Sequence, residues 1–107
     1  MAKKKNIIRI VDVTNRDGVQ TCKLGLAKLE KTMLNIFLDK MGVFQSEFGF
    51  PLTEHETNYL NANLELAKMG VIKNLRLSGW VRAMRSDIEG GLKKVPGLEY
   101  INMSISL

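Results

Sequence analysis

Three groups of polar side chains in this 107-residue chain have the types and spacing to act on a ligand: Arg16, Asp17 and Gln20; Glu47; and Ser78, Trp80, Arg82 and Arg85. Asp17 offers a hard oxygen ligand that suits Mg²⁺ or Mn²⁺ and is acceptable to Zn²⁺. Arg16 carries a planar fork that can hold a carboxylate or stabilise a developing oxyanion. The same Arg-Asp-Gly sequence also fits an ordinary turn with a surface ion pair, so both interpretations stay open at this point.

Glu47 lies in a segment that is otherwise apolar enough to be covered on one face. An unpaired ionised carboxylate would be costly there. We therefore expect Glu47 either to pair with a cation such as Arg16 or to point into a polar cavity, and a position beside a metal site would satisfy both. Trp80 either lines a pocket or packs at the end of its strand.

The segments that must position these groups alternate between strand and helix patterns. β-Branched or alternating apolar residues predict strands over 7–13, 43–48, 74–80 and 100–106. A helix is expected between each strand and the next. The loop 14–18 follows the first strand, Glu47 ends the second, and the Trp80 group ends the third.

Three helices are predicted from apolar spacing and from their start and stop signals. Steps of three and four residues indicate an amphipathic helix that ends at Gly42, with apolar positions Leu26, Leu29, Met33, Phe37 and Met41. Thr53 with Glu56 forms a capping box for a helix that stops at Gly70. Ser86 with Glu89 forms another, for a short helix that Gly90-Gly91 weakens.

The resulting order, β-α-β-α-β-α-β, predicts an α/β fold with parallel strands and right-handed connections. The strands begin roughly 30 residues apart, which is the spacing of a (β/α)8 barrel of about 250 residues. We therefore expect residues 1–107 to be one partial domain, the N-terminal half of a TIM barrel. Ligands gather at the carboxyl ends of strands in such folds.

Composition excludes several classes of protein. With 45% hydrophobic and 25% charged residues the chain is typical of a globular protein. No apolar run is long enough to cross a membrane, no signal peptide is evident, and Cys22 has no cysteine partner, so we expect a cytoplasmic protein that does not bind membranes. The net charge of +5 includes Lys3, Lys4 and Lys5, and we expect no nucleic-acid partner.

Three ordered motifs resemble one known family. The segment 11–20, Val-Asp-Val-Thr-Asn-Arg-Asp-Gly-Val-Gln, resembles the opening signature of the metal-dependent aldolase-type TIM barrels, which include homocitrate synthase, isopropylmalate synthase, hydroxymethylglutaryl-CoA lyase and carboxyltransferase domains. The segment 47–51, Glu-Phe-Gly-Phe-Pro, is similar to the family's Glu-x-Gly-x-Pro. The segments 80–83 and 87–88 look most like homocitrate synthases of the nitrogen-fixation type. Asn15 departs from the family's usual leucine, and Val19 from the glutamate usual in the synthases.

The resemblance implies a Claisen condensation for amino-acid biosynthesis, in which acetyl-CoA attacks a 2-oxo acid held on a divalent metal and the thioester is hydrolysed. The favoured 2-oxo acid is 2-oxoglutarate. Carried over by position, Asp17 is the metal ligand and Arg16 steadies the substrate and the new alkoxide. Gln20 and Arg82 contact the substrate, and Glu47 is the catalytic glutamate beneath the site.

The resemblance also implies ligands that this chain lacks. The family completes its metal site with a His-x-His pair, whereas this chain has one histidine, His55. We therefore expect the metal (Mg²⁺, Mn²⁺ or Zn²⁺) to be held weakly and the chain alone to be inactive. Because both outer strands of a half-barrel are unpaired, we expect self-association or a complementary barrel half as partner. The alternatives are another branch of the family, or a non-catalytic half-barrel that binds a partner subunit.

Overall fold

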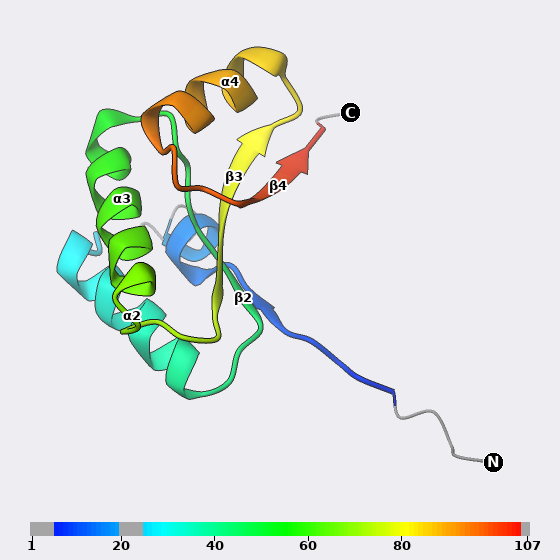
Figure 1. The fold of residues 1–107 in the computed structure, drawn as a ribbon. Helices are drawn as coiled ribbons and strands as arrows, with labels where there is room; N and C mark the ends of the chain where they lie inside the picture. Colours follow the sequence, from blue (N-terminus) through cyan, green and yellow to red (C-terminus); the bar gives the residue numbers. More distant parts are fainter. Residues whose placement is uncertain (1–5, 20–24, 106–107) are drawn as a thin grey trace.

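The computed structural model describes residues 6–19 and 25–105. Along the chain these residues form β1 (Val11–Asp12), the π-helix η1 (Thr14–Gly18), α2 (Lys28–Lys40), β2 (Gln45–Gly49), α3 (Glu54–Lys68), β3 (Arg76–Arg82), α4 (Arg85–Lys94) and β4 (Tyr100–Ser104). Figure 1 shows the strands side by side, with the helices beside them. No helix within these ranges is long and apolar enough to span a membrane.

The four strands form one parallel sheet in the order β1-β2-β3-β4. Each strand lies beside the one that precedes it, and a helix lies between each pair along the chain. This arrangement confirms the α/β class and the parallel order predicted from the sequence, and it is that of half a TIM barrel. The carboxyl ends of all four strands therefore lie at the same edge of the sheet.

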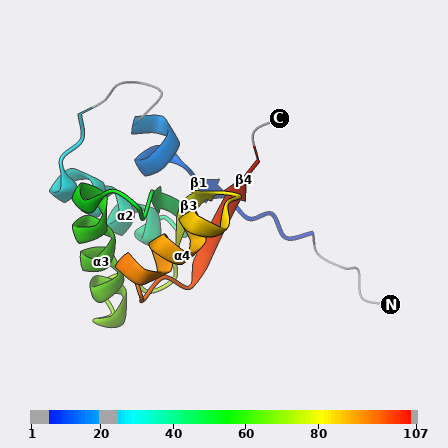
Figure 2. The same ribbon diagram turned by 90° about the horizontal axis from the view of Figure 1, so that it is seen from above.

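Helices α2, α3 and α4 lie together on one face of the sheet, as the view from above shows (Figure 2). The core between the helices and the strands is formed by side chains that are at most 6% exposed, namely Leu38, Phe48, Tyr59, Leu60, Ile72, Leu75, Leu77, Val95 and Leu98. Since each fully buried side chain of this kind contributes about 1.5–3 kcal/mol, this cluster is the main source of stability.

Glycines end two helices and bring a third close to the sheet. Gly42 and Gly70 have φ values of 81° and 80°, a left-handed conformation that favours glycine, which confirms both predicted helix ends. In α4, a Cβ on Gly91 would lie 3.0 Å from Pro51 Cγ. The Gly90-Gly91 pair weakens the helix locally but lets α4 approach the segment after β2.

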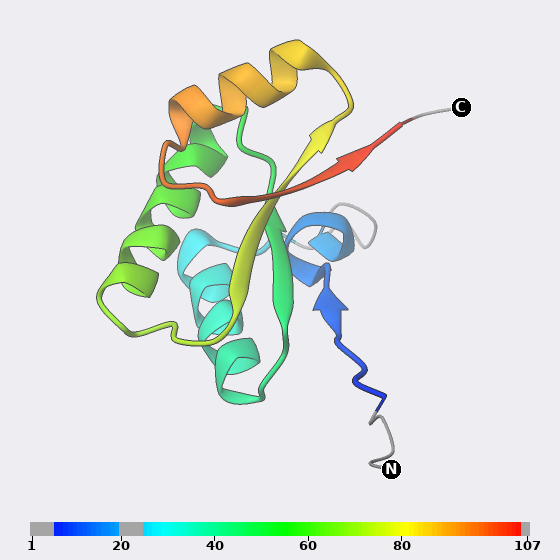
Figure 3. The same ribbon diagram turned by 45° about the vertical axis from the view of Figure 1, so that its right-hand side comes forward.

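Two predictions for the N-terminal segment of the chain are wrong. The first strand covers Val11–Asp12 rather than 7–13, because the parallel pairing begins where Val11 meets Gln45 on β2. Ile7, Ile8 and Ile10 are exposed, and although the Ile10 carbonyl oxygen accepts a hydrogen bond from the N–H group of Gln45 at 3.3 Å, none of these three described residues is paired in the sheet. Residues 14–18 form a π-helix rather than a loop. Figure 3 shows η1 directly after β1, at the carboxyl edge of the sheet.

The apolar stripe of α2 faces outwards. The helix itself is confirmed, but Leu29, Met33, Phe37 and Met41 are 46–76% exposed. The buried side of the helix instead carries Lys31, Asn35, Leu38 and Asp39. The predicted periodicity was correct, but the side chains of that stripe do not enter the core of the described residues.

The two predicted capping boxes do not form. Thr53 precedes α3 as expected, but its side chain makes no capping hydrogen bond, and Glu56 pairs instead with Lys31 on α2 at 2.5 Å. Helix α4 begins at Arg85, so Ser86 lies inside the helix, and Glu89 pairs with Arg85. Long-range ion pairing and a shifted helix start therefore replace the local caps.

Candidate active site

The π-helix η1 places three successive side chains in different surroundings at the carboxyl edge of the sheet. The backbone N–H groups of Arg16, Asp17 and Gly18 all donate to the Val13 carbonyl oxygen, at 3.3, 2.8 and 3.1 Å. Asn15 is buried, Arg16 is 15% exposed in its side chain and Asp17 is 53% exposed. Single-turn π-helices occur frequently at functional sites, because they redirect neighbouring side chains.

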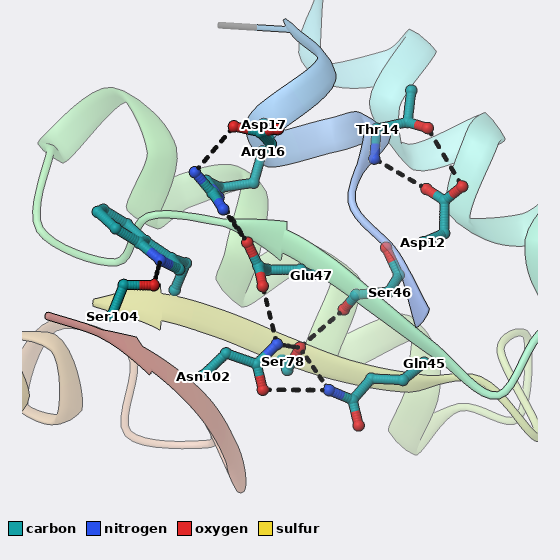
Figure 4. Close-up of polar contacts among 11 residues, drawn as sticks. Asp12, Thr14, Arg16, Asp17, Gln45, Ser46, Glu47, Ser78, Asn102 and Ser104 are labelled. Carbon is teal, nitrogen blue, oxygen red and sulfur yellow. Dashed lines mark hydrogen bonds and ion pairs between the residues drawn. The ribbon is translucent and has the colours of Figure 1, made fainter. Parts of the chain in front are cut away.

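Arg16 lies between the two carboxylates predicted for the site (Figure 4). Its Nε and Nη2 atoms lie 2.5 Å from Glu47 Oε1, and its Nη1 atom lies 3.3 Å from Asp17 Oδ1. The guanidinium also stacks on the ring of Trp80, 4.5 Å from its centroid. Asp17, Arg16 and Glu47 are therefore brought together, as the sequence predicted.

Glu47 is held from both sides. While Oε1 bonds to Arg16, Oε2 accepts a hydrogen bond from Asn102 Nδ2 at 2.9 Å. Glu47 is 6% exposed, so the cation offsets the cost of burying its charge. Of the two surroundings expected for Glu47, the structure shows the ion pair with Arg16, and the same carboxylate also belongs to a polar row of side chains.

That polar row crosses three strands below the arginine. Ser78 Oγ lies 3.1 Å from Gln45 Nε2 and 3.2 Å from Asn102 Nδ2, and Gln45 Nε2 also donates to Asn102 Oδ1 at 3.2 Å. Trp80 Nε1 donates to Ser104 Oγ at 2.9 Å. Gln45 and Asn102 were not among the residues predicted for the site. Their two-residue spacing from Glu47 and Ser104 was the signal that could have found them.

Arg82 lies at the end of β3 but does not join this cluster. Its Nε and Nη2 atoms each lie 2.8 Å from the carboxylate of Asp87, on the first turn of α4. These hydrogen bonds from Arg82 hold the pKa of Asp87 below its usual value, and Asp87 in turn raises the pKa of Arg82. The side chain of Arg82 is 57% exposed. Gln20 lies outside the described residues.

One cavity lies beside Arg16, and another lies away from the candidate site. A cavity of about 130 Å³ is bordered by Asn15, Arg16, Lys31 and Glu56. A larger one, about 630 Å³, lies at the opposite end of the sheet and is bordered by Lys68, Arg76 and Tyr100 among others. Of the described residues that were predicted for the site, none borders the larger cavity.

Comparison with curated proteins shows which proteins are similar in sequence to this chain. The citrate (Re)-synthase of Dehalococcoides mccartyi is 66% identical over 92% of this chain and 24% of its own length. The 2-isopropylmalate synthase 2 of Caldanaerobacter subterraneus is 33% identical over 97% of this chain and 26% of its own. Homocitrate synthase 1 of Nostoc is 32% identical over 94% and 25%. No family model matches the chain.

The chain belongs to this family of citrate, homocitrate and isopropylmalate synthases. It spans about a quarter of the length of these relatives and matches their N-terminal region. The family resemblance read from three short motifs is thereby confirmed.

Asp17 is the residue that the sequence predicted as a metal ligand, and its surroundings can be compared with what a divalent metal requires. Asp17 presents a half-exposed carboxylate with one cationic neighbour, and carboxylate oxygens suit such a metal. Across residues 6–19 and 25–105, no three His, Cys, Asp or Glu side chains come close enough together to hold a metal ion. Asp17 thus has the chemistry of a single metal ligand, and the described residues do not by themselves form a metal site.

Proposed function

We propose that this chain is the N-terminal part of an acyltransferase that condenses acetyl-CoA with a 2-oxo acid in a Claisen reaction. The observation that carries the proposal is the position of Arg16, held between Asp17 and Glu47 at the carboxyl edge of a parallel sheet. Strand ends of this kind are where (β/α) enzymes bind their substrates. The family of synthases to which the chain belongs supports the same reaction.

The favoured 2-oxo acid follows from the names of the relatives. Removing an acetyl unit from citrate leaves oxaloacetate, and removing it from homocitrate leaves 2-oxoglutarate, which is one methylene longer. The 66% identity to a citrate (Re)-synthase, against 32% to a homocitrate synthase, supports oxaloacetate. The 2-oxoglutarate expected from the sequence motifs is the second candidate.

Arg16 is the group that we expect to contact the substrate. A guanidinium donates several hydrogen bonds in one plane, so it can hold the substrate carboxylate and stabilise the alkoxide that forms when the keto carbon is attacked. Stacking on Trp80 and pairing with Glu47 fix its orientation before the substrate binds. Gln20 and Arg82 remain proposed substrate contacts. Arg82 would bind the substrate from its position beside Asp87, with which it forms an ion pair.

Glu47 acts through Arg16 in this proposal. Both of its oxygens already accept hydrogen bonds, from Arg16 and from Asn102, and the side chain is 8% exposed. A carboxylate with its oxygens occupied in this way is poorly placed to take a proton from acetyl-CoA. We therefore assign Glu47 the role of positioning the arginine, rather than the catalytic role that the family resemblance implied.

Asp17 would hold the divalent metal (Mg²⁺, Mn²⁺ or Zn²⁺) in the complete protein. When bound, such a metal polarises the keto group of a 2-oxo acid and makes its carbon a better electrophile. Asp17 is half-exposed and its carboxylate faces the guanidinium of Arg16. The arginine can thus reach a substrate held beside Asp17.

The remaining ligands and the remaining strands would come from a complementary barrel half. Strands β1 and β4 are the outer strands of the sheet, and unpaired parallel edges are templates for association. We propose that this half is supplied by further polypeptide of the same enzyme, and that the chain as printed does not turn over substrate by itself. Self-association would cover the same edges in its absence.

Release of free CoA thiol from acetyl-CoA by the full-length enzyme tests the proposed function. We expect a kcat/KM at least about tenfold higher with oxaloacetate than with 2-oxoglutarate, since one methylene changes binding by about 1–3 kcal/mol. The variant Asp17→Asn should lower kcat/KM by at least about 100-fold, because loss of even a neighbour of a metal ligand costs about 10- to 100-fold.

The matched control for the turnover experiment is Asp12→Asn. Asp12 also ends β1, but its carboxylate accepts hydrogen bonds from Thr14 and lies apart from Arg16 (Figure 4). Its activity should stay within about threefold of the parent's, corresponding to a change of about 0.7 kcal/mol. No CoA release with any 2-oxo acid in the presence of Mg²⁺, Mn²⁺ or Zn²⁺ would contradict the proposal and favour a non-catalytic half-barrel.

A further inference from the structure

A buried polar network ties the π-helix to the two helices behind it. Asn15 Nδ2 lies 2.9 Å from the Lys31 carbonyl oxygen, 3.0 Å from Asn35 Oδ1 and 3.2 Å from Tyr59 Oη. Asn15 is 2% exposed, so these contacts are made without competition from bulk solvent. One amide group from η1 thereby reaches both α2 and α3.

Asn35 extends the network to the sheet. Its Nδ2 atom donates to Tyr59 Oη at 2.9 Å and to Asn63 Oδ1 at 3.0 Å, and its Oδ1 atom accepts from Ser46 Oγ on β2 at 3.1 Å. Burial raises the pKa of Tyr59 well above its usual value, so the hydroxyl stays protonated. Connected buried networks of this kind are rigid because each unmade bond is costly.

Asn15 carries a cost that an apolar residue would avoid. Among the described residues, Asn15 Oδ1 is the buried side-chain atom that has no hydrogen-bond partner. Leaving such an acceptor unpaired is unfavourable, so the contacts made by the Nδ2 atom must offset that cost. Leucine, the usual residue here in the family resemblance, would remove the unpaired oxygen but would also remove all three contacts of the Nδ2 atom.

Asn15 and Arg16 are adjacent residues held on opposite sides of η1. Asn15 is fixed against the helices, whereas the side chain of Arg16 reaches across to Glu47 and Trp80 over the sheet. The backbone of η1 is thus clamped from both sides. Because a guanidinium must be placed accurately to hold a planar carboxylate, the anchor at Asn15 bears directly on the site.

We infer that Asn15 is a positioning residue, which fixes η1 so that Arg16 stays stacked on Trp80 and paired with Glu47. The inference rests on the proposed function for the meaning of the arginine's position, but the position itself can be measured without turnover. The groups that hold Asn15 in place are the carbonyl oxygen of Lys31 and the side chains of Asn35 and Tyr59.

Trp80 provides the measurement, because it is the single tryptophan of the chain and Arg16 lies 4.5 Å from its ring. A cation over the indole attracts iodide, whereas neutral acrylamide is indifferent to charge. We would measure the ratio of the iodide to the acrylamide quenching constant. Arg16→Ala should lower this ratio, because it removes the cation over the ring. The decrease in Asn15→Leu should be at least half of the decrease in Arg16→Ala.

Thr32→Val is the matched control, because the Thr32 hydroxyl accepts a hydrogen bond from Asn63 at the far end of the network and donates one to the Lys28 carbonyl oxygen rather than bonding to Asn15. Its quenching ratio should equal that of the parent. If circular dichroism shows that Asn15→Leu does not fold, Tyr59→Phe carries the test, since it removes the hydroxyl that Asn15 and Asn35 share.

Two results would overturn the inference: parental quenching ratios in folded Asn15→Leu or Tyr59→Phe, or an equal fall in Thr32→Val. In the full-length enzyme, Asn15→Leu should raise the KM for the 2-oxo acid more than it lowers kcat. Failure of all variants and the parent to release CoA would contradict the proposed function alone, because the quenching ratio does not depend on turnover.

Discussion

Asn102 on β4 donates a hydrogen bond to Glu47 on β2, with 2.9 Å between Nδ2 and Oε2, although the two residues are 55 positions apart in the sequence. Strand β3 lies between them and contributes Ser78 to the same row. The other oxygen of Glu47 bonds to Arg16 after β1. The carboxylate of Glu47 therefore connects a side chain from β4 with one that follows β1. Replacing Glu47 should therefore destabilise contacts across the whole sheet.

The pair formed by Arg16 and Glu47 should contribute measurably to stability. Arg16→Ala leaves a nearly buried carboxylate without its cation, and we expect a loss of about 1–3 kcal/mol in the free energy of unfolding. In a double-mutant cycle, Arg16→Ala with Glu47→Gln should lose less than the sum of the single variants, by about 1 kcal/mol. Urea unfolding followed by circular dichroism measures both quantities.

The control for that cycle is the exposed pair of Arg85 and Glu89, whose side chains are 90% and 68% exposed. Arg85→Ala should lower the free energy of unfolding by about 0.5 kcal/mol or less, because water screens such pairs. Equal losses in Arg16→Ala and Arg85→Ala would show that burial of the Glu47 pair has no energetic consequence.

Gly49→Ala should destabilise the fold through a steric clash. A Cβ at this position would lie 2.7 Å from Glu56 Oε2 and 2.8 Å from Leu60 Cδ2, both closer than normal contact. We expect a loss of about 1–3 kcal/mol, as for other overpacked cores, seen as a lower urea midpoint. Gly25→Ala is the control, since its Cβ would meet no atom of the described residues within 4 Å, and a similar loss there would refute the steric explanation.

Asp39 should make the fold sensitive to acid. Burial by itself raises the pKa of Asp39, but hydrogen bonds from the backbone N–H groups of Asn74, Lys73 and Leu75 outweigh the effect of burial, so the pKa of Asp39 lies below its usual value. The contribution of Asp39 is therefore complete above the pKa of the unfolded chain and is lost as the pH falls through the lower, folded-state pKa.

The measurement is the urea midpoint from pH 7 down to about pH 3, where carboxylates of this kind become protonated. Asp39→Asn should be less stable than the parent at pH 7 by about 1–3 kcal/mol, and the difference should shrink as the pH falls below about 4. A difference that stays constant down to pH 3 would show that the Asp39 charge is not responsible.

The outward stripe of α2 should promote association. Met33 and Phe37 are 46% and 52% exposed, and contiguous exposed apolar side chains mark interaction surfaces. Replacing both with glutamine should lower the apparent mass of the chain in light scattering at high concentration. Ala62→Gln on the exposed side of α3 is the control; an unchanged mass in the double variant would leave the edges β1 and β4 as the associating surfaces.

Much of the fold could be predicted because its signals are local. The stops at Gly42 and Gly70 follow from the left-handed conformation that glycine tolerates, and the strand-helix alternation follows from apolar periodicity. The length of β1 could not be predicted in this way. Ile7, Ile8 and Ile10 have the residue types of a strand, but a strand needs a neighbour, and β2 begins its pairing only at Val11.

The same difference between local signals and long-range contacts applies to the candidate site. By itself the sequence determined that Arg16, Asp17 and Glu47 come together, because side chains at the carboxyl ends of neighbouring strands of a parallel sheet reach the same edge. The tertiary structure alone decided that Asn15 faces a polar network, that the apolar stripe of α2 faces outwards, and that Asn102 completes the bonding of Glu47. Those contacts join positions far apart in the chain, so they depend on strand register and helix rotation, which local periodicity does not specify.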